Sequence, residues 1–147
     1  MPATGWGRPS HCCGHAAGDA VLKRVAEALR GAARNIDSVA RVGGEEFCVL
    51  LPGADEFGAD CVAGRMLDTV RGLHHPEIGG AQVTVSIGLV VVEAPAESIQ
   101  DLQRRLDQAL YSAKAAGRDR VERAMPAIDG NSTRSQRVDP LCSPIHR

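Results

Sequence analysis

The chain has 147 residues, of which 44% are hydrophobic and 24% are charged, a composition that suits one domain with one aliphatic core. Seventeen Lys and Arg against eighteen Asp and Glu give a formal charge of -1, which excludes a basic surface for non-specific nucleic-acid binding. The aromatic content of 3% argues against a base-stacking surface. No two cysteines have Cys-x-x-Cys spacing, so neither a zinc site nor a disulfide framework is predicted.

The two ends of the sequence differ in composition from its middle. Residues 1–13 contain prolines, glycines and no periodic pattern, so they are predicted to be irregular, and residues 125–147, rich in Pro, Ser, Asn and Arg, are predicted to be disordered. Residues 14–124 form the predicted domain. No run approaches the roughly 18 apolar residues of a membrane span, and Met1 to Ser10 lacks the apolar stretch of a secretory signal. We therefore expect a cytoplasmic protein without a membrane segment.

Apolar residues recur at helical spacing in three stretches, which predict helices over residues 16–33, 56–73 and 99–117. Asp19 is expected to place a carboxylate in the first turn of the first helix. Gly117 is a typical residue at a helix C-terminus. Each helix is expected to pack one apolar face against a sheet.

The strands are predicted from shorter apolar runs. Ser38 to Val42 and Phe47 to Leu51 flank a glycine pair, the pattern of a β-hairpin. Alternating apolar and polar residues over 82–92 predict a long strand, and Val121 is expected in a short last strand. The order helix, hairpin, helix, strand, helix, strand predicts an α+β sandwich, with helices packed on a mixed, mainly antiparallel sheet.

The predicted hairpin turn carries the sharpest chemical feature of the sequence. Gly43 and Gly44 let the backbone approach a ligand closely, and the carboxylates of Glu45 and Glu46 follow at once. Carboxylate oxygens are ligands that Mg²⁺ prefers, together with substrate phosphates and water. The alternative is structural: Gly-Gly is a favoured hairpin turn, and glutamates on an exposed turn are usually solvated. The turn alone does not decide between the two.

Four motifs together resemble the GGDEF family, the diguanylate cyclases, with Glu45 in place of the Asp of the family's signature. They are Gly14-His15-Ala16-Ala17-Gly18-Asp19, Val39–Phe47, Val83-Thr84-Val85-Ser86-Ile87-Gly88 and Asp107–Arg118. The resemblance runs from Gly14 to about Val121. It implies a ferredoxin-like fold of the nucleotidyl-cyclase palm type, and condensation of two GTP to cyclic di-GMP with release of pyrophosphate. It also implies Mg²⁺ or Mn²⁺ as cofactor and a homodimer as the active form.

The resemblance assigns roles to individual residues. Glu45 and Glu46 are the implied catalytic carboxylates and metal ligands, and Gly43 and Gly44 leave room for the phosphates. The cations that would reach the triphosphate are Lys114 and Arg118. The alternative for both cations is a favourable position at the negative end of a helix. Asp19 matches the acid that accepts the N–H groups of guanine, and its alternative is an ordinary carboxylate near a helix start.

A second implied site is regulatory. Arg34 and Asp37 lie upstream of the turn as the family's Arg-x-x-Asp inhibitory site does, and Arg65 matches an additional arginine. A guanidinium pairs bidentately with guanine O6 and N7, and a carboxylate accepts from guanine N–H groups. The alternative is that Arg34 is a helix-end cation and Asp37 a turn residue. A rival to the cyclase function follows: a non-catalytic module that binds cyclic di-GMP at these three residues.

The sequence departs from the family before residue 14. The family's domain opens with a strand carrying an Asp-x-Asp-x-Phe-Lys pattern, followed by an Asn-Asp pair. Counting back from Gly18, the metal-binding Asp falls at Pro2, the lysine at Gly7 and the Asn-Asp pair at Ser10-His11. The first strand of the sheet is therefore expected to be missing or altered. We expect little turnover from this chain by itself, which leaves its status as an enzyme open.

Overall fold

The computed structural model describes residues 15–92 and 98–125. The elements, in chain order, are α1 (His15–Ala32), β1 (Ser38–Gly43), β2 (Glu46–Leu50), α2 (Glu56–Arg71), the 3₁₀ turn η1 (Pro76–Ile78), β3 (Ile87–Leu89), α3 (Ile99–Ala115) and β4 (Val121–Arg123). The predicted order of helices and strands is confirmed. The expectations for residues 1–13 and for the tail beyond Met125 fall outside the described residues.

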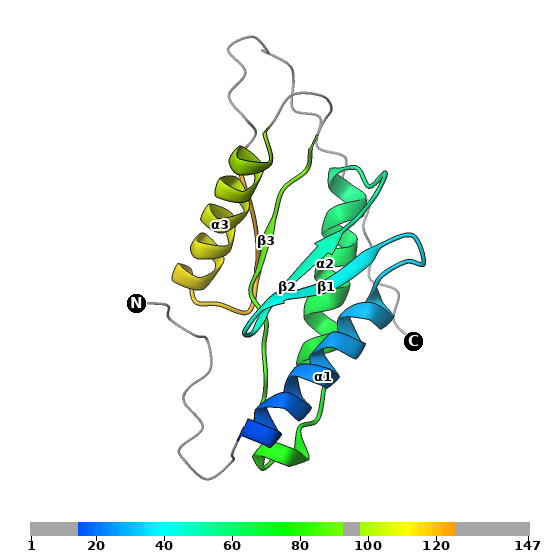
Figure 1. The fold of residues 1–147 in the computed structure, drawn as a ribbon, viewed down its shortest axis with the longest axis vertical. Helices are drawn as coiled ribbons and strands as arrows, with labels where there is room; N and C mark the ends of the chain where they lie inside the picture. The colour runs from blue at the N-terminus through cyan, green and yellow to red at the C-terminus, as the bar shows by residue number, and fades with distance from the viewer. Residues whose placement is uncertain (1–14, 93–97, 126–147) are drawn as a thin grey trace.

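The first two helices form one layer by packing against each other (Figure 1). The apolar stripe of α1 is buried through Val21, Val25 and Leu29, as its spacing predicts. One detail is wrong: α1 already runs from His15, so Asp19 lies beyond the first turn, and its side chain is exposed. The carboxylate of Asp19 therefore gains less from the positive N-terminal end of the helix than expected, because this effect falls off after the first turn.

The starts of α2 and α3 are capped by side chains. The carboxylate of Asp55 accepts a hydrogen bond from the backbone N–H of Gly58, and the Ser98 hydroxyl accepts one from the backbone N–H of Asp101. Such caps satisfy backbone donors that have no partner in the first turn of a helix. No helix within the two described ranges has both the length and the apolar character needed to cross a membrane.

β1 and β2 form the predicted antiparallel hairpin. The register pairs Ser38 with Leu50 and Arg41 with Phe47, then shifts so that Gly43 pairs with Glu46. The shift is a bulge at Val42, which moves the two-residue turn to Gly44 and Glu45. The turn therefore lies within the predicted segment from Gly43 to Glu45, and Glu45 belongs to the turn itself.

The second strand pair differs more from expectation. β3 and β4 are parallel, with Ile87 opposite Val121, and the long strand predicted over 82–92 contains only three residues of regular strand. The strand pairing is therefore mixed, as predicted. Within residues 15–92 and 98–125 the strands form two two-stranded sheets, β1–β2 and β3–β4. An alternating pattern becomes a strand only where a partner supplies hydrogen bonds, and residues 82–86 have no such partner in the described structure.

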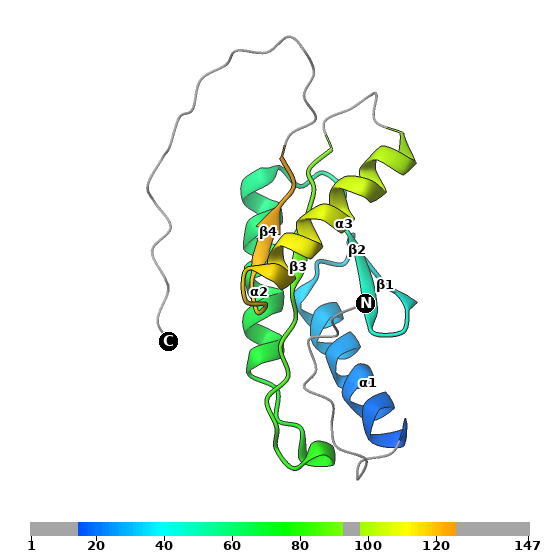
Figure 2. The same ribbon diagram turned by 90° about the vertical axis from the view of Figure 1, so that its left-hand side faces the viewer.

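The core lies between α1, α2 and the strands. Its buried residues are Val21, Val25, Ala28, Leu29, Ala32, Val62, Met66, Val70 and Val83. On the other side of β3, α3 buries only Ala109 and Ala113 fully. Both views place β3 between α2 and α3 (Figures 1 and 2). The leucines at helical spacing along α3 are half-buried: Leu102, Leu106 and Leu110.

Candidate functional site

The tip of the β1–β2 hairpin presents the two predicted carboxylates. Glu45 is half-buried and Glu46 is exposed, and Gly44 has a φ of 22°. Arg41 fixes the turn, since its Nε and Nη2 donate to the carbonyl oxygen of Gly44 at 2.8 and 2.5 Å. Sequence reasoning assigned Arg41 no role, although it precedes the glycine pair in the same motif. Two side-chain hydrogen bonds therefore stabilise the conformation of the turn.

The C-terminal end of α3 holds the two predicted cations. Gly117 has a φ of 111°, and the N–H of Arg118 donates to the carbonyl oxygen of Ala113 at 3.0 Å. This is the hydrogen bond of a Schellman motif, in which a residue with positive φ ends the helix. Lys114 lies in the last turn of α3 and Arg118 directly after the glycine that ends the helix, and both residues are half-buried.

One groove, with a volume of about 890 Å³, joins the hairpin tip to the end of α3. Glu45, Glu46, Lys114 and Arg118 all line it, as does Asp107, which sequence reasoning left without a role. Asp107 opens the same motif that ends in Arg118, and that position is the only sequence feature that could have indicated it. The structure therefore brings acidic and basic side chains from distant parts of the sequence into one groove.

The predicted site residues are not all in this groove. Gly43 and Gly44 lie in the hairpin that carries the two glutamates but do not line the groove, and Asp19 does not line it either. Asp19 belongs to the second turn of α1, on the solvent side. The charged end of the groove thus consists of the hairpin tip and the C-terminal end of α3.

The carboxylates at the tip fit a site at which the protein supplies only some of the ligands of a metal ion. The described residues contain no group of three or more His, Cys, Asp or Glu side chains that could hold a metal ion. Glu45 and Glu46 supply carboxylate oxygens next to each other in the chain, and neither side chain makes a hydrogen bond or ion pair with another described residue. Mg²⁺ commonly binds through one or two carboxylates, substrate phosphates and water. The donor set fits that pattern.

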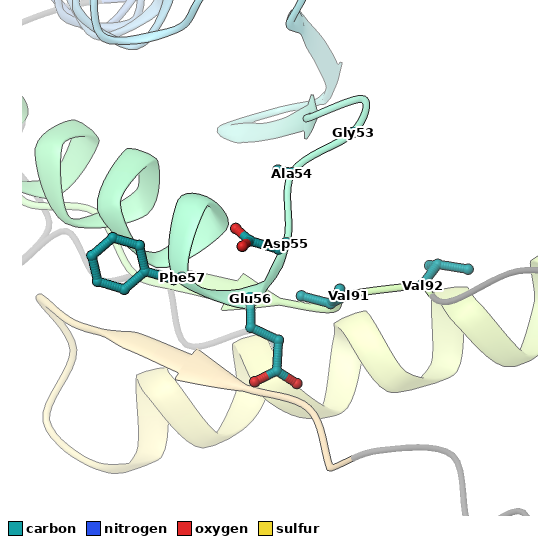
Figure 3. Close-up of a pocket in the computed structure, with 7 residues that line it drawn as sticks. All are labelled: Gly53, Ala54, Asp55, Glu56, Phe57, Val91 and Val92. Atoms are coloured by element: carbon teal, nitrogen blue, oxygen red, sulfur yellow. The ribbon is translucent and has the colours of Figure 1, made fainter. Parts of the chain in front are cut away.

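A smaller hollow of about 580 Å³ lies at the start of α2 (Figure 3). Its two carboxylates have structural partners. Asp55 caps α2 through Gly58 N–H, and Glu56 accepts from Nη1 of Arg123 at 3.0 Å. Phe57 points away from these two side chains. Because both acids are already engaged, this hollow does not compete with the groove as a functional site.

The predicted regulatory residues lie together near the end of α1. Arg34 Nη2 donates to Asp37 Oδ1 at 3.0 Å, and the backbone N–H of Arg34 donates to Asp37 Oδ2 at 2.7 Å. The hydrogen bonds from Arg34 hold the pKa of Asp37 below its ordinary value, and the charge of Arg65 acts in the same direction. Arg65 itself donates through Nε to the carbonyl oxygen of Ala32 at 2.8 Å. The carboxylate that would read guanine is thus occupied by Arg34.

The comparison with protein families decides the assignment. The sequence model of the family described as "Diguanylate cyclase, GGDEF domain" matches residues 10–120. The chain belongs to the GGDEF family. The fold agrees with this assignment. The palm-like α+β architecture expected from the resemblance is confirmed by the similarity to solved GGDEF structures.

Three relatives of this GGDEF domain show how far the likeness extends. It is 41% identical to "Diguanylate cyclase A" of Treponema denticola over 109 residues, which cover 74% of this chain and 29% of the relative. An EAL/GGDEF domain protein from M. capsulatus superposes with a TM-score of 0.66 at 36% identity, covering 78% of this chain and 75% of the other. The active GGEEF domain of a diguanylate cyclase from Vibrio cholerae gives 0.68 at 28%, covering 78% and 72%.

The length of the match matters for function. The chain spans less than a third of the curated relatives it matches, 29% of one and 25% of another. The Vibrio cholerae domain is of the GGEEF form, and Gly43 to Phe47 of this chain have the same five residues. Glu in place of the Asp of the signature is therefore a form that occurs within the family.

Proposed function

We propose that this chain is a diguanylate cyclase domain that binds GTP, with Mg²⁺ or Mn²⁺, at the charged end of the groove. The observation that carries the proposal is that Glu45, Glu46, Lys114 and Arg118 line one cavity. Two carboxylates can share a divalent cation with phosphate oxygens, and the two cations offset the remaining charge of a triphosphate. We infer GTP as the nucleotide from family membership, because relatives are named diguanylate cyclases.

The roles of the residues follow from their places. Glu45 and Glu46 hold the metal, Lys114 and Arg118 bind the triphosphate, and the turn at Gly43 and Gly44 lets phosphates approach the backbone. A bound divalent cation would polarise the phosphate and neutralise charge that develops on its oxygens. Asp19 is proposed as a guanine contact, although its exposed position on α1 outside the groove makes it the weakest of the assignments.

The proposed reaction joins two nucleotides held by two copies of the domain. The 3′-oxygen of each GTP forms a bond to the α-phosphorus of the other, the bond to the pyrophosphate oxygen breaks, and each 3′-hydroxyl proton is released. Two such steps give cyclic di-GMP and two pyrophosphates. For this chain alone we expect little turnover, because Pro2, Gly7 and Ser10-His11 stand where the family has a metal-binding Asp, a Lys and an Asn-Asp pair.

Binding and turnover are tested separately. Titration of the chain with GTP and Mg²⁺ is expected to show saturable binding that weakens at least about tenfold in Glu45→Gln, because a metal ligand is lost. Glu27→Gln is the matched control, since Glu27 is exposed on α1 away from the groove. Equal binding by both variants contradicts the proposed site. Pyrophosphate release from GTP measures turnover, and fast release that Glu45→Ala abolishes contradicts the expectation of low activity.

A receptor function is the alternative, and the cluster at Arg34, Asp37 and Arg65 favours it. The three side chains gather beside the end of α1, where a guanine could exchange for the internal Arg34–Asp37 pair. The test is titration with cyclic di-GMP without GTP. Micromolar or tighter binding, about -8 kcal/mol or better, that disappears in Asp37→Ala supports the receptor. Binding of neither nucleotide contradicts both functions.

A further inference from the structure

Residues 117–119, in the turn between α3 and β4, have an uncommon backbone conformation. The φ of Gly117 is 111°, that of Arg118 is 61° and that of Asp119 is 51°. Within the two described ranges, Arg118 and Asp119 are the only residues other than glycine with positive φ. Asp tolerates this left-handed region better than most residues, whereas Arg has no such tolerance. The conformation persists only where neighbouring groups hold it, so Arg118 must be held by its surroundings.

Backbone hydrogen bonds fix the chain on both sides of this segment. The N–H of Arg118 donates to the carbonyl oxygen of Ala113 on α3 at 3.0 Å. Two residues further on, the carbonyl oxygen of Arg120 accepts from the N–H of Ile87 on β3 at 2.9 Å. These bonds tie the segment to the end of α3 and to β3. Asp119 lies between the two tied positions and is held from a third element, α2.

Arg71, in the last turn of α2, makes a forked contact with Asp119. Its Nε lies 2.9 Å from both carboxylate oxygens of Asp119, and its Nη2 donates to the backbone carbonyl oxygen of Asp119 at 2.8 Å. The remaining nitrogen, Nη1, donates to Asp68 on α2 at 3.0 Å, which fixes the guanidinium on its own helix. Because the planar fork contacts both the side chain and the backbone of Asp119, it restrains the backbone next to Arg118.

Of the three residues Arg71, Arg118 and Asp119, only Arg118 lines the groove. β4, which follows the turn, lies alongside α2 (Figure 2). An effect of Arg71 on a ligand in the groove would therefore pass through Arg118. The rotamers open to a side chain depend on its backbone φ and ψ, so the conformation of the turn decides where the guanidinium of Arg118 points.

We propose that Arg71 is a positioning residue for the triphosphate: its contact with Asp119 keeps Arg118 in the left-handed conformation that directs the Arg118 guanidinium into the groove. This inference rests on the function proposed above, in which Arg118 binds the phosphates. A guanidinium contacts phosphate through two parallel N–H groups, so the contact depends on the direction of the planar group. A misdirected Arg118 would keep its charge and lose part of that contact. Arg71 itself touches no ligand.

Two matched variants separate positioning from stability. Arg123 on β4 donates to Asp60 at 2.8 Å and to Glu56 at 3.0 Å, so it ties β4 to the other end of α2, and it does not line the groove. Arg71→Lys should bind GTP with Mg²⁺ at least about fivefold more weakly than the parent, because the phosphate contact depends on geometry. Arg123→Lys loses a similar fork elsewhere and should bind as the parent does. Equal binding by the parent and Arg71→Lys, or equal weakening in both variants, overturns the proposal.

A double-mutant cycle shows whether Arg71 acts through Arg118. Arg118→Ala should weaken binding of GTP by itself, and Arg71→Lys should add no further weakening in that background, because the side chain that it positions is gone. A further loss as large as in the parent overturns this inference alone. Unchanged binding in Arg118→Ala overturns the triphosphate role of Arg118, and the positioning role of Arg71 with it. The two failures are therefore distinguishable.

A measurement without nucleotide tests the conformation itself. The Cα and Cβ chemical shifts of Arg118 in NMR spectra follow its backbone dihedrals. They should indicate positive φ in the parent and in Arg123→Lys, and move toward the values of negative φ in Arg71→Lys, because the turn has lost its restraint. Unchanged shifts in Arg71→Lys overturn the proposal. If Arg71→Lys does not fold, Asp119→Ala replaces it in all three measurements, since it removes the carboxylate on the other side of the same contact.

Discussion

Gly88 of β3 lies so close to Leu110 of α3 that a Cβ atom on Gly88 would fall 2.5 Å from the backbone nitrogen of Leu110 and 2.8 Å from the carbonyl oxygen of Leu106. Backbone atoms cannot move aside as the end of a flexible side chain can. The glycine of the Val83–Gly88 motif therefore has a packing role: it lets α3 approach β3 and cover one side of the groove.

The first prediction concerns this contact. Gly88→Ala should lower the free energy of unfolding by about 1–3 kcal/mol, because overpacking forces a backbone shift. Gly64→Ala is the control, since no atom lies within 4 Å of a Cβ there and alanine favours the interior of α2. It should raise stability by roughly 0.5–1 kcal/mol. Urea unfolding measures both, and an unchanged midpoint in Gly88→Ala contradicts the close approach.

The second prediction concerns the cap of α2. Asp55→Ala should destabilise the chain by about 1 kcal/mol, because the Gly58 N–H loses its acceptor. Asp55→Asn keeps an oxygen acceptor at the same place and is expected to stay close to the parent. Thermal unfolding of the two variants side by side is the measurement. If Asn and Ala are equally harmful, the role of Asp55 lies in its charge and not in the cap.

The third prediction concerns the turn between α3 and β4. Arg71 of α2 donates from Nε to both carboxylate oxygens of Asp119 at 2.9 Å and from Nη2 to its backbone oxygen at 2.8 Å. Arg71→Lys should lower the urea midpoint measurably, because a lysine cannot make this forked contact. Arg104→Lys replaces an exposed arginine, paired with Asp101 on α3, and should change little. Equal midpoints for the two variants count against the Arg71–Asp119 contact as a structural one.

The fourth prediction concerns pH. Hydrogen bonds from Arg34 lower the pKa of Asp37 in the folded chain, so the unfolded chain binds a proton first as pH falls. The contribution of this pair to stability is therefore complete above the ordinary carboxyl pKa of about 4 and is lost as pH falls below it through the folded pKa. Asp37→Asn should flatten this part of the stability profile, measured by urea unfolding between acid and neutral pH.

A control separates this effect from general acid unfolding. Asp107→Asn removes an exposed carboxylate that has no hydrogen-bond partner within the described residues, and its profile should follow that of the parent. Because the Asp37 side chain is fully buried while 41% of the Arg34 side chain is exposed, salt should weaken the pair only in part. A parent-like profile in Asp37→Asn contradicts the assigned cause.

Local patterns in the sequence were sufficient for most of the elements. Helix spacing placed α1, α2 and α3 within a few residues, and paired apolar runs placed the hairpin. These patterns work because a helix and a tight hairpin make their hydrogen bonds between residues near in sequence. The same logic failed for the long strand over 82–92, whose hydrogen bonds depend on partners far away in the chain.

The candidate site divides in the same way. The motifs named Glu45, Glu46, Lys114 and Arg118 from the sequence, through resemblance and residue type. Only the tertiary structure places all four on one groove, leaves Asp19 outside it and shows Arg34 already bonded to Asp37. It alone also shows that β3 pairs with β4 and not with β2 in the described residues. Sequence determines which side chains and local turns exist, whereas long-range packing decides which of them meet, because contacts between distant segments depend on how whole helices and strands pack.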